Sequence, residues 1–106
     1  MGNAETLING HLHPVRSEAV AFRVIEGEAV LLALEGGVYY TLNEIGTVAW
    51  DMCDGTNSVG AIVRAVIAEY EVDELTAQRD LKELLEDLTA EGLVNLNEVL
   101  GEAEKD

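Results

Sequence analysis

The chain has 106 residues and a formal net charge of −15, because six Lys and Arg residues stand against 21 Asp and Glu residues. Its length suits one compact domain with one core, and its 48% hydrophobic content is typical of a globular protein. The charge disfavours nucleic acids and anionic membranes as partners, and no apolar run approaches the roughly 20 residues that cross a bilayer.

Residues 1–18 mix Gly, Asn, His and Pro without a sustained period, so we expect a mobile N-terminal segment there. A folded domain is predicted over residues 19–95, followed by an acidic C-terminal tail at residues 96–106. The first residues lack the pattern of a secretory signal, and the lone Cys53 cannot close an intrachain disulfide. We therefore expect a cytoplasmic protein.

Three strands are predicted at the start of the domain. Residues 20–24 alternate apolar and polar side chains, and residues 26–28 supply a turn. An apolar run at residues 29–34 and a β-favouring run at residues 38–42 flank Glu35-Gly36-Gly37, which is typical of a tight turn. These two runs are expected to form a hairpin.

Three helices are predicted after the sheet. Asn43, Ser58 and Asp73 each precede a stretch in which apolar residues recur at three and four positions, which is the pattern of an N-capped amphipathic helix. Gly92 is typical of the residue that follows the end of a helix. The sequence therefore predicts an α+β, winged helix-turn-helix-like domain with a small three-stranded antiparallel sheet followed by three helices. A short sheet beside helices leaves one strand edge free, which suggests a surface that captures an extended peptide.

A set of residues in the predicted third strand and helices resembles a known family. The set comprises Gly37-Val38-Tyr39-Tyr40-Thr41-Leu42-Asn43-Glu44, Trp50, Cys53-Asp54-Gly55-Thr56, Ile62, Asp80, Leu84, Leu88 and Gly92-Leu93. Over about residues 19–94 the chain resembles the PqqD-like proteins, the peptide-recognition domains of ribosomally made, modified peptide pathways. The resemblance implies a small winged-helix domain without catalytic residues or a cofactor.

The resemblance also implies partners. The leader segment of a precursor peptide would add as a strand beside the third strand, against the third helix. The domain would deliver this precursor to a modifying enzyme, often one that uses radical S-adenosylmethionine chemistry. Pyrroloquinoline quinone synthesis and another modified-peptide pathway both fit.

The expected peptide-binding cleft has a strand wall and a helix wall. Its residues are Val38, Tyr39, Tyr40, Thr41 and Leu42 on the strand, and Gln78, Arg79, Lys82 and Leu85 on the helix. Alternation along the strand places Tyr40 in the core and leaves Tyr39 to meet solvent or a partner.

The basic residues of the third helix allow two interpretations. Arg79 and Lys82 are the only basic residues between Asp73 and Glu91, so they are candidate partners for an acidic group on a leader peptide. The alternative is pairing within the helix, with acidic neighbours at one to four positions. Those neighbours are Asp80, Glu83 and Glu86.

Two further kinds of function are open. A winged helix also suggests a DNA-binding regulator, but here the last helix carries two basic and seven acidic residues from Asp73 to Glu91, which disfavours DNA. The other alternative is a regulatory or structural protein-interaction domain that docks a folded protein through its helices. The free strand edge allows either a monomer or a weak homodimer.

No catalytic, metal or cofactor site is predicted, so the protein is not expected to be an enzyme. His11 and His13 supply two imidazoles, whereas a zinc site needs three or four protein ligands. Cys53 lies beside Asp54, whose charge discourages a thiolate, so we interpret it as a buried filler. Trp50 is expected to pack against the sheet or the N-terminal segment, with anchoring of a partner enzyme as the alternative.

Overall fold

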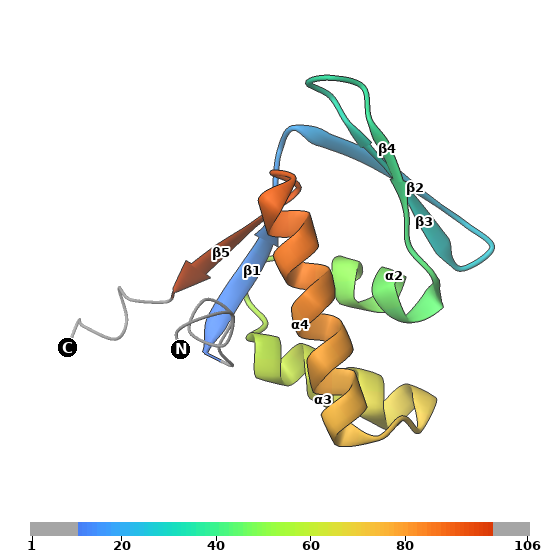
Figure 1. Ribbon diagram of the computed structural model, residues 1–106, viewed down its shortest axis with the longest axis vertical. Helices are drawn as coiled ribbons and strands as arrows, with labels where there is room; N and C mark the ends of the chain where they lie inside the picture. Colours follow the sequence, from blue (N-terminus) through green and yellow to red (C-terminus); the bar gives the residue numbers. More distant parts are fainter. Residues whose placement is uncertain (1–10, 99–106) are drawn as a thin grey trace.

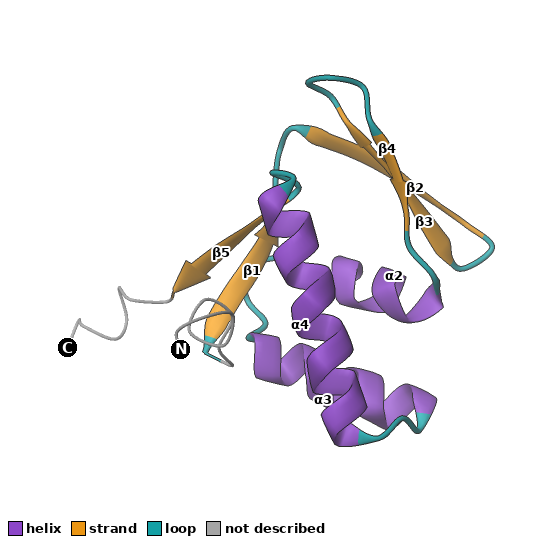
Figure 2. Cartoon of the chain, viewed as in Figure 1, coloured by secondary structure: helices purple, strands orange, loops and turns teal. Residues whose placement is uncertain are grey.

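The computed structural model describes residues 11–98 of the chain. The elements in chain order are β1 (Leu12–Arg16), β2 (Val20–Ile25), β3 (Glu28–Ala33), β4 (Tyr39–Thr41), α2 (Glu44–Asp51), α3 (Val59–Tyr70), α4 (Glu74–Ala90) and β5 (Val94–Glu98). The helices lie together on one side of the sheet formed by β2, β3 and β4 (Figure 1). A two-stranded sheet of β1 and β5 lies on the other side of α4 (Figure 2). No helix in residues 11–98 is long and apolar enough to span a bilayer.

The sheet confirms the predicted α+β fold class. It is antiparallel, its order is β2-β3-β4, and each strand agrees with its predicted range to within one residue at either end. Glu26 and Gly27 join β2 to β3 with positive φ angles of 53° and 83°. Two consecutive positive φ angles give a hairpin turn whose twist matches that of the flanking strands.

The three predicted N-caps are confirmed. Each cap side chain accepts a hydrogen bond from the main-chain N–H three residues further on: Asn43 Oδ1 from Gly46 at 2.8 Å, Ser58 Oγ from Ala61 at 3.0 Å and Asp73 Oδ2 from Thr76 at 3.0 Å. After α4, Gly92 adopts a φ of 77°, which reverses the chain so that the N–H of Leu93 reaches the carbonyl oxygen of Leu88 at 2.8 Å.

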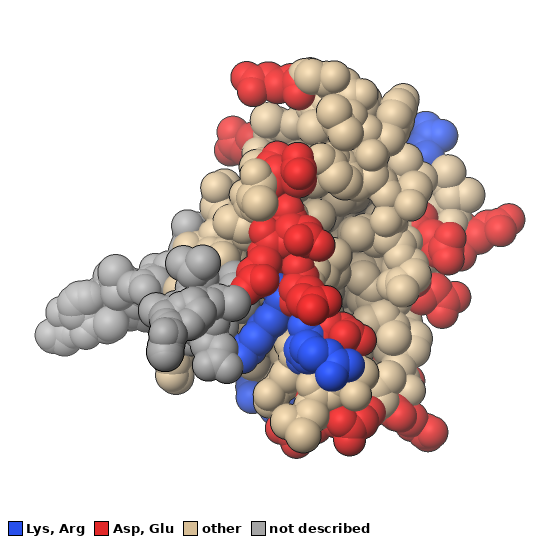
Figure 3. Space-filling model, viewed as in Figure 1, with Lys and Arg blue, Asp and Glu red and all other residues tan. Residues whose placement is uncertain are grey.

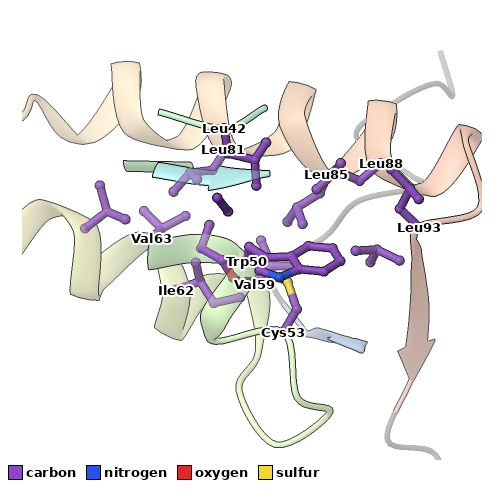
Figure 4. Close-up of a cluster of buried hydrophobic side chains, with 14 of the residues drawn as sticks. Leu42, Trp50, Cys53, Val59, Ile62, Val63, Leu81, Leu85, Leu88 and Leu93 are labelled. Carbon is purple, nitrogen blue, oxygen red and sulfur yellow. Dashed lines mark hydrogen bonds between the residues drawn. The ribbon is translucent and has the colours of Figure 1, made fainter. Parts of the chain in front are cut away.

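One hydrophobic core joins the inner face of the sheet to the helices. Its most deeply buried large side chains are those of Trp50, Leu31, Ile62, Leu85, Leu93 and Val59. The leucines of α4 line one side of this core and Trp50 lies opposite them (Figure 4). Trp50 is 1% exposed, and its ring meets Phe22 of β2 edge-on at a centroid distance of 5.4 Å. The prediction that Trp50 packs against the sheet is therefore confirmed.

A buried hydroxyl group, that of Thr47, connects β3, β4 and α2. Its Oγ1 accepts a hydrogen bond from the N–H of Ala29 at 2.8 Å and donates to the carbonyl oxygen of Leu42 at 3.4 Å. The N–H of Leu42 donates to the carbonyl oxygen of Ala29 at 2.9 Å. Thr47 thus completes the pairing at the last position of the β3–β4 ladder and holds the end of β4 against the first turns of α2.

The N-terminal part corrects the sequence prediction. Residues 12–16, expected to be mobile, form β1 and pair antiparallel with residues 94–98 of β5. Arg16 shows why this strand docks, since its guanidinium donates to the carbonyl oxygens of Trp50 and Asp51, both at 2.9 Å. A cation at the carboxyl end of α2 complements the helix dipole. The folded part therefore begins before residue 19 and continues past residue 95, to residue 98 of β5. Residues 1–10 and 99–106 lie outside the described part.

The segment between α2 and α3 has a structural role. It contains Cys53-Asp54-Gly55-Thr56, which is among the residues that carry the resemblance to the PqqD-like proteins. Asp54 Oδ1 accepts hydrogen bonds from Thr56 Oγ1 at 2.7 Å and Thr56 N at 2.9 Å, and these bonds, the hydroxyl one first, lower the pKa of Asp54. The N–H of Gly55 donates to the carbonyl oxygen of Pro14 at 3.0 Å, and Val15 forms a β-bridge with Asp54. This loop therefore holds β1 in place.

Replacing Thr47 tests the hydroxyl bridge. Thr47→Val keeps the shape of the side chain but leaves the buried N–H of Ala29 without its acceptor, so we expect it to lower the free energy of unfolding by about 1–3 kcal/mol. Thr47→Ser is the matched control, because it keeps the hydroxyl and should cost less. Urea unfolding followed by tryptophan fluorescence measures both. Equal stability of Thr47→Val and the wild type would contradict this role.

Candidate peptide-binding site

The strand β4 forms one edge of the described three-stranded sheet. The order β2-β3-β4 gives it a neighbour on one side only, which confirms the prediction of a free edge at this strand. Tyr40 faces Leu31 in the register, with Tyr39 and Thr41 opposite Leu32 and Val30.

The direction of each main-chain group in β4 follows from two hydrogen bonds. Ala33 N donates to Val38 O at 2.9 Å, and Leu42 N donates to Ala29 O at 2.9 Å. Residues that exchange hydrogen bonds in an antiparallel pair alternate with residues whose N–H and C=O point away from the partner strand. Positions 38, 40 and 42 therefore face β3, while the N–H and C=O groups of Tyr39 and Thr41 point out from the sheet edge.

The exposed side chains of this edge include apolar and hydroxyl groups. Tyr39 is 67% exposed and Val38 is 49% exposed, and Thr41 is also exposed. Leu42 is only 7% exposed and belongs to the core. The edge thus combines two outward main-chain pairs with accessible side chains, while Leu42 anchors it.

Tyr40 links β4 to the end of α4. Its side chain is partly buried against the core, as predicted, and its hydroxyl donates to Glu91 Oε1 at 2.6 Å. This bond to a carboxylate raises the pKa of Tyr40, since ionisation would remove the donor and place two negative charges together. The bond holds the carboxyl end of α4 close to β4.

The helix residues predicted for the cleft do not come together beside β4. Leu85 is 0% exposed and lies in the core, so its predicted place on an accessible wall is wrong. Gln78 and Lys82 line a hollow of about 250 Å³ between α3 and α4, together with residues such as Val63 of α3. This hollow lies along the side of α4 that faces α3.

Arg79 follows the alternative interpretation of its charge. It is 66% exposed, and its Nε lies 3.5 Å from Oδ1 of its neighbour Asp80. An exposed pair of this kind contributes between nothing and about 1 kcal/mol to stability. Arg79 therefore lies on the solvent side of α4, paired within the helix.

A different set of α4 residues lies on the side of the helix that faces α2 and, at its end, β4. Leu84 approaches α2 closely, because a Cβ atom placed on Gly46 would lie 3.5 Å from Leu84 Cδ2. Glu91 bonds Tyr40 of β4. Residues three, four and seven apart share one face of a helix, so Asp80 and Asp87 belong to the same side as Leu84 and Glu91. We call Asp80, Leu84, Asp87 and Glu91 the acidic side of α4.

The residues of the acidic side of α4 recur in the sequence with the same period as the buried stripe, so the sequence predicts that they share a face. The sequence does not show which neighbouring element lies beside that face. In the view of Figure 3, acidic side chains run along α4, while basic side chains gather only towards its lower half. The acidic side of α4 therefore presents three carboxylates and one leucine.

Cys53 and His13 both make contacts within the described fold. Cys53 is fully buried, its Sγ lies 3.1 Å from the carbonyl oxygen of Ala49, and burial raises the pKa of its thiol to about 12. Within residues 11–98 no three His, Cys, Asp or Glu side chains are grouped to hold a metal ion. His13 Nδ1 instead lies 2.9 Å from the carbonyl oxygen of His11.

An edge strand beside a helix, in a small α+β domain, is typical of proteins that bind an extended peptide by strand addition. The family model described as coenzyme PQQ synthesis protein D (PqqD) matches residues 28–94, and the chain belongs to this family. The match extends from β3 through all three helices to the start of β5. It confirms the resemblance seen in the sequence.

Two solved structures are similar to the chain. One is described as TbiB1 in complex with the TbiA(beta) leader peptide; it has a TM-score of 0.70 and 36% identity, and the match covers 76% of this chain and 94% of that one. The other is described as lasso peptide synthetase B1 complexed with the leader peptide; it has a TM-score of 0.70 and 22% identity, covering 78% of this chain and 98% of that one. The second similarity concerns the fold. No curated protein sequence matches the chain.

The chemistry of Cys53 gives a direct test of its burial. Because its pKa is raised to about 12, almost no thiolate forms at pH 8 in the folded protein. We expect native Cys53 to react with a thiol reagent roughly a thousandfold more slowly than in guanidinium chloride, where the ordinary pKa returns and the thiolate fraction rises by that factor. Absorbance after addition of the reagent follows both reactions. Comparable rates would show that Cys53 is accessible.

Proposed function

We propose that this protein is a non-catalytic adaptor that captures the leader segment of a precursor peptide as an added strand beside β4. It then presents the precursor to a modifying enzyme, for which a radical S-adenosylmethionine enzyme is the leading class. The observation that carries the proposal is the free edge of β4, where Tyr39 and Thr41 direct their main-chain groups away from β3. A strand placed there satisfies these groups.

The similarity to TbiB1 supports this choice of ligand. At 36% identity over most of both chains, TbiB1 has the same fold and was solved with a leader peptide. The buried Cys53 with its raised pKa supports a role without covalent catalysis. Since the precursor is made on the ribosome, the proposal places the protein in the cytoplasm. Pyrroloquinoline quinone synthesis and another modified-peptide pathway both accommodate it.

The side chains around the edge define which leader fits. Along an added strand, alternate side chains point to opposite faces of the sheet, so one set faces the helices and α4. That set meets the acidic side of α4, where Leu84 offers an apolar contact and Asp80, Asp87 and Glu91 offer carboxylates. The proposed leader therefore carries apolar and basic side chains on this face. This replaces the expected pairing of an acidic leader group with Arg79 and Lys82.

Proline at position 41 tests strand addition. Thr41→Pro removes an N–H that points out from the edge and leaves the hydrogen bonds to β3 in place, and proline is tolerated on edge strands. We expect the leader of a precursor encoded beside this protein to bind at least about tenfold more weakly, which is about 1.4 kcal/mol. Isothermal calorimetry measures the affinity. Circular dichroism checks that the variant is folded.

Thr41→Val is the matched control for this substitution. It retains both the β-branched shape and the main-chain N–H, so its affinity for the leader should stay close to that of the wild type. If Thr41→Pro binds the leader as tightly as Thr41→Val does, strand addition at β4 is ruled out.

Neutralising Asp87 tests the sign of the charge on the leader. Asp87→Asn removes one carboxylate from the acidic side of α4, and we expect it to weaken leader binding about two- to fivefold at low salt, with a smaller effect at high salt. Glu86→Gln is the control, since it makes the same change of net charge at a position of α4 that does not share the spacing of the acidic side, and it should have little effect. Tighter binding by Asp87→Asn would mean that the leader presents negative charge here.

A further inference from the structure

The sheet has a second free edge, at β2. Within the described residues β2 has only β3 as a neighbour, and it is six residues long. Leu34 N donates to Ala19 O at 2.9 Å, and the β2–β3 register places Phe22 opposite Leu31. By the alternation of antiparallel pairs, residues 20, 22 and 24 direct their N–H and C=O groups away from β3. This edge offers three outward main-chain pairs.

A groove of about 550 Å³ lies beside this edge, between β2 and the helices α2 and α3. We call it the β2 groove. Its apolar lining comes mainly from Phe22, Val24, Val48, Trp50, Met52 and Tyr70. Phe22 is 43% exposed and Val24 is 50% exposed, so the β2 side of this lining is open to solvent. Phe22 and Tyr70 supply aromatic surfaces that a ligand in the groove contacts, whereas Trp50 is buried against Phe22.

All charged side chains that line the β2 groove are acidic. They are Glu44, Asp51 and Glu69. Burial raises the pKa of Tyr70, and the negative charges of Glu69 and Glu44 raise it further, which is consistent with a negative potential at this end of the groove. Acidic groups beside aromatic rings form a site that favours a cation.

One cation is already present nearby, on β1. The guanidinium carbon of Arg16 lies 5.5 Å from the ring centre of Phe22 and 5.9 Å from that of Trp50. Arg16 is held by the carbonyl oxygens at the end of α2 and does not line the groove. The open cationic position is therefore at the other end, between Glu44, Glu69 and Tyr70.

We propose that the β2 edge and the β2 groove bind an extended basic segment of the modifying enzyme. Its main chain pairs with the outward groups of residues 20, 22 and 24, and an Arg or Lys side chain enters the groove between Glu44 and Glu69. The identity of this partner rests on the proposed function, whereas the surface is separate from β4. Because β2 and β4 are opposite edges of one sheet, leader and enzyme bind at the same time.

Charge distinguishes this occupant from a second copy of the chain. A copy that paired its β2 with this β2 would bring its own Glu44, Asp51 and Glu69 to the same place, in addition to a net charge of −15 on each chain. Like charges facing each other across an interface oppose association. A basic segment has the complementary sign.

Nuclear magnetic resonance with a synthetic probe tests this proposal. The probe is a nine-residue, end-blocked peptide that alternates Arg and Val, and its counterpart has Glu in place of Arg. We expect the Arg peptide to shift the amide signals of residues 20–25 and of Glu69 and Tyr70 saturably, including in Thr41→Pro, in which the β4 edge is blocked. The Glu peptide should leave these signals unchanged.

Two pairs of variants sharpen the test. Val24→Pro removes an outward N–H of β2 and should abolish the shifts at residues 20–25, whereas Val24→Ala loses the side chain but keeps the N–H and should retain them. Glu69→Gln should weaken binding of the Arg peptide at least threefold. Glu83→Gln makes the same change of net charge and should leave this affinity unchanged. Absence of saturable shifts at β2 up to about 1 mM peptide, a weak interaction at best, would overturn the proposal. So would shifts that persist unchanged in Val24→Pro.

The same variants separate this proposal from the proposed function. Leader binding by Val24→Pro should match that of the wild type, because the leader uses β4. If the leader binds at β2 instead, Val24→Pro loses leader affinity and both assignments of the edges are wrong. If the signals of residues 20–25 in the protein alone shift on dilution, a second copy occupies this edge and the enzyme assignment is overturned.

Discussion

The hydrogen bonding of β3 is the constraint from which the surfaces of this protein follow. In the three-stranded sheet, β3 alone has neighbours on both sides, with even-numbered residues bonded towards β2 and odd-numbered residues bonded towards β4. Each outer strand must therefore direct alternate N–H and C=O groups away from the sheet. A sheet of three strands thus carries two edges that can each accept a further strand, and its function depends on what surrounds each edge.

The helices make these two edges different. Beside β4, the hydroxyl of Thr47 and the Tyr40–Glu91 bond connect the strand to α2 and α4, so the edge faces the acidic side of α4. Beside β2, the rings of Phe22 and Trp50, which meet edge-on, line a groove with acidic groups around it. Arg16 fixes the end of α2 from β1, which keeps Trp50 in place. The fold thereby gives the two free edges of the described sheet different surroundings.

The local features of this fold are predictable from the sequence. Asn43, Ser58 and Asp73 act as caps because a side-chain oxygen beside an orphaned N–H depends only on neighbouring residues. Long-range features are not predictable in this way. The pairing of β1 with β5 joins residues about 80 positions apart, and neither strand has a strong pattern of its own. In the candidate site, the position of Tyr39 and Tyr40 followed from alternation. Leu85 was misplaced because a periodic stripe identifies the buried face of α4 and not the neighbours on its flanks.

The central claim concerns single main-chain groups in β4, so amide hydrogen exchange at each residue tests it most directly. When the leader of its precursor is bound, the account predicts strong protection of the N–H groups of Tyr39 and Thr41, with little change at Tyr40, whose N–H already faces β3. Unchanged exchange at Tyr39 and Thr41 in the saturated complex would contradict the account. Protection at Phe22 and Val24 in their place would show that the leader binds the other edge.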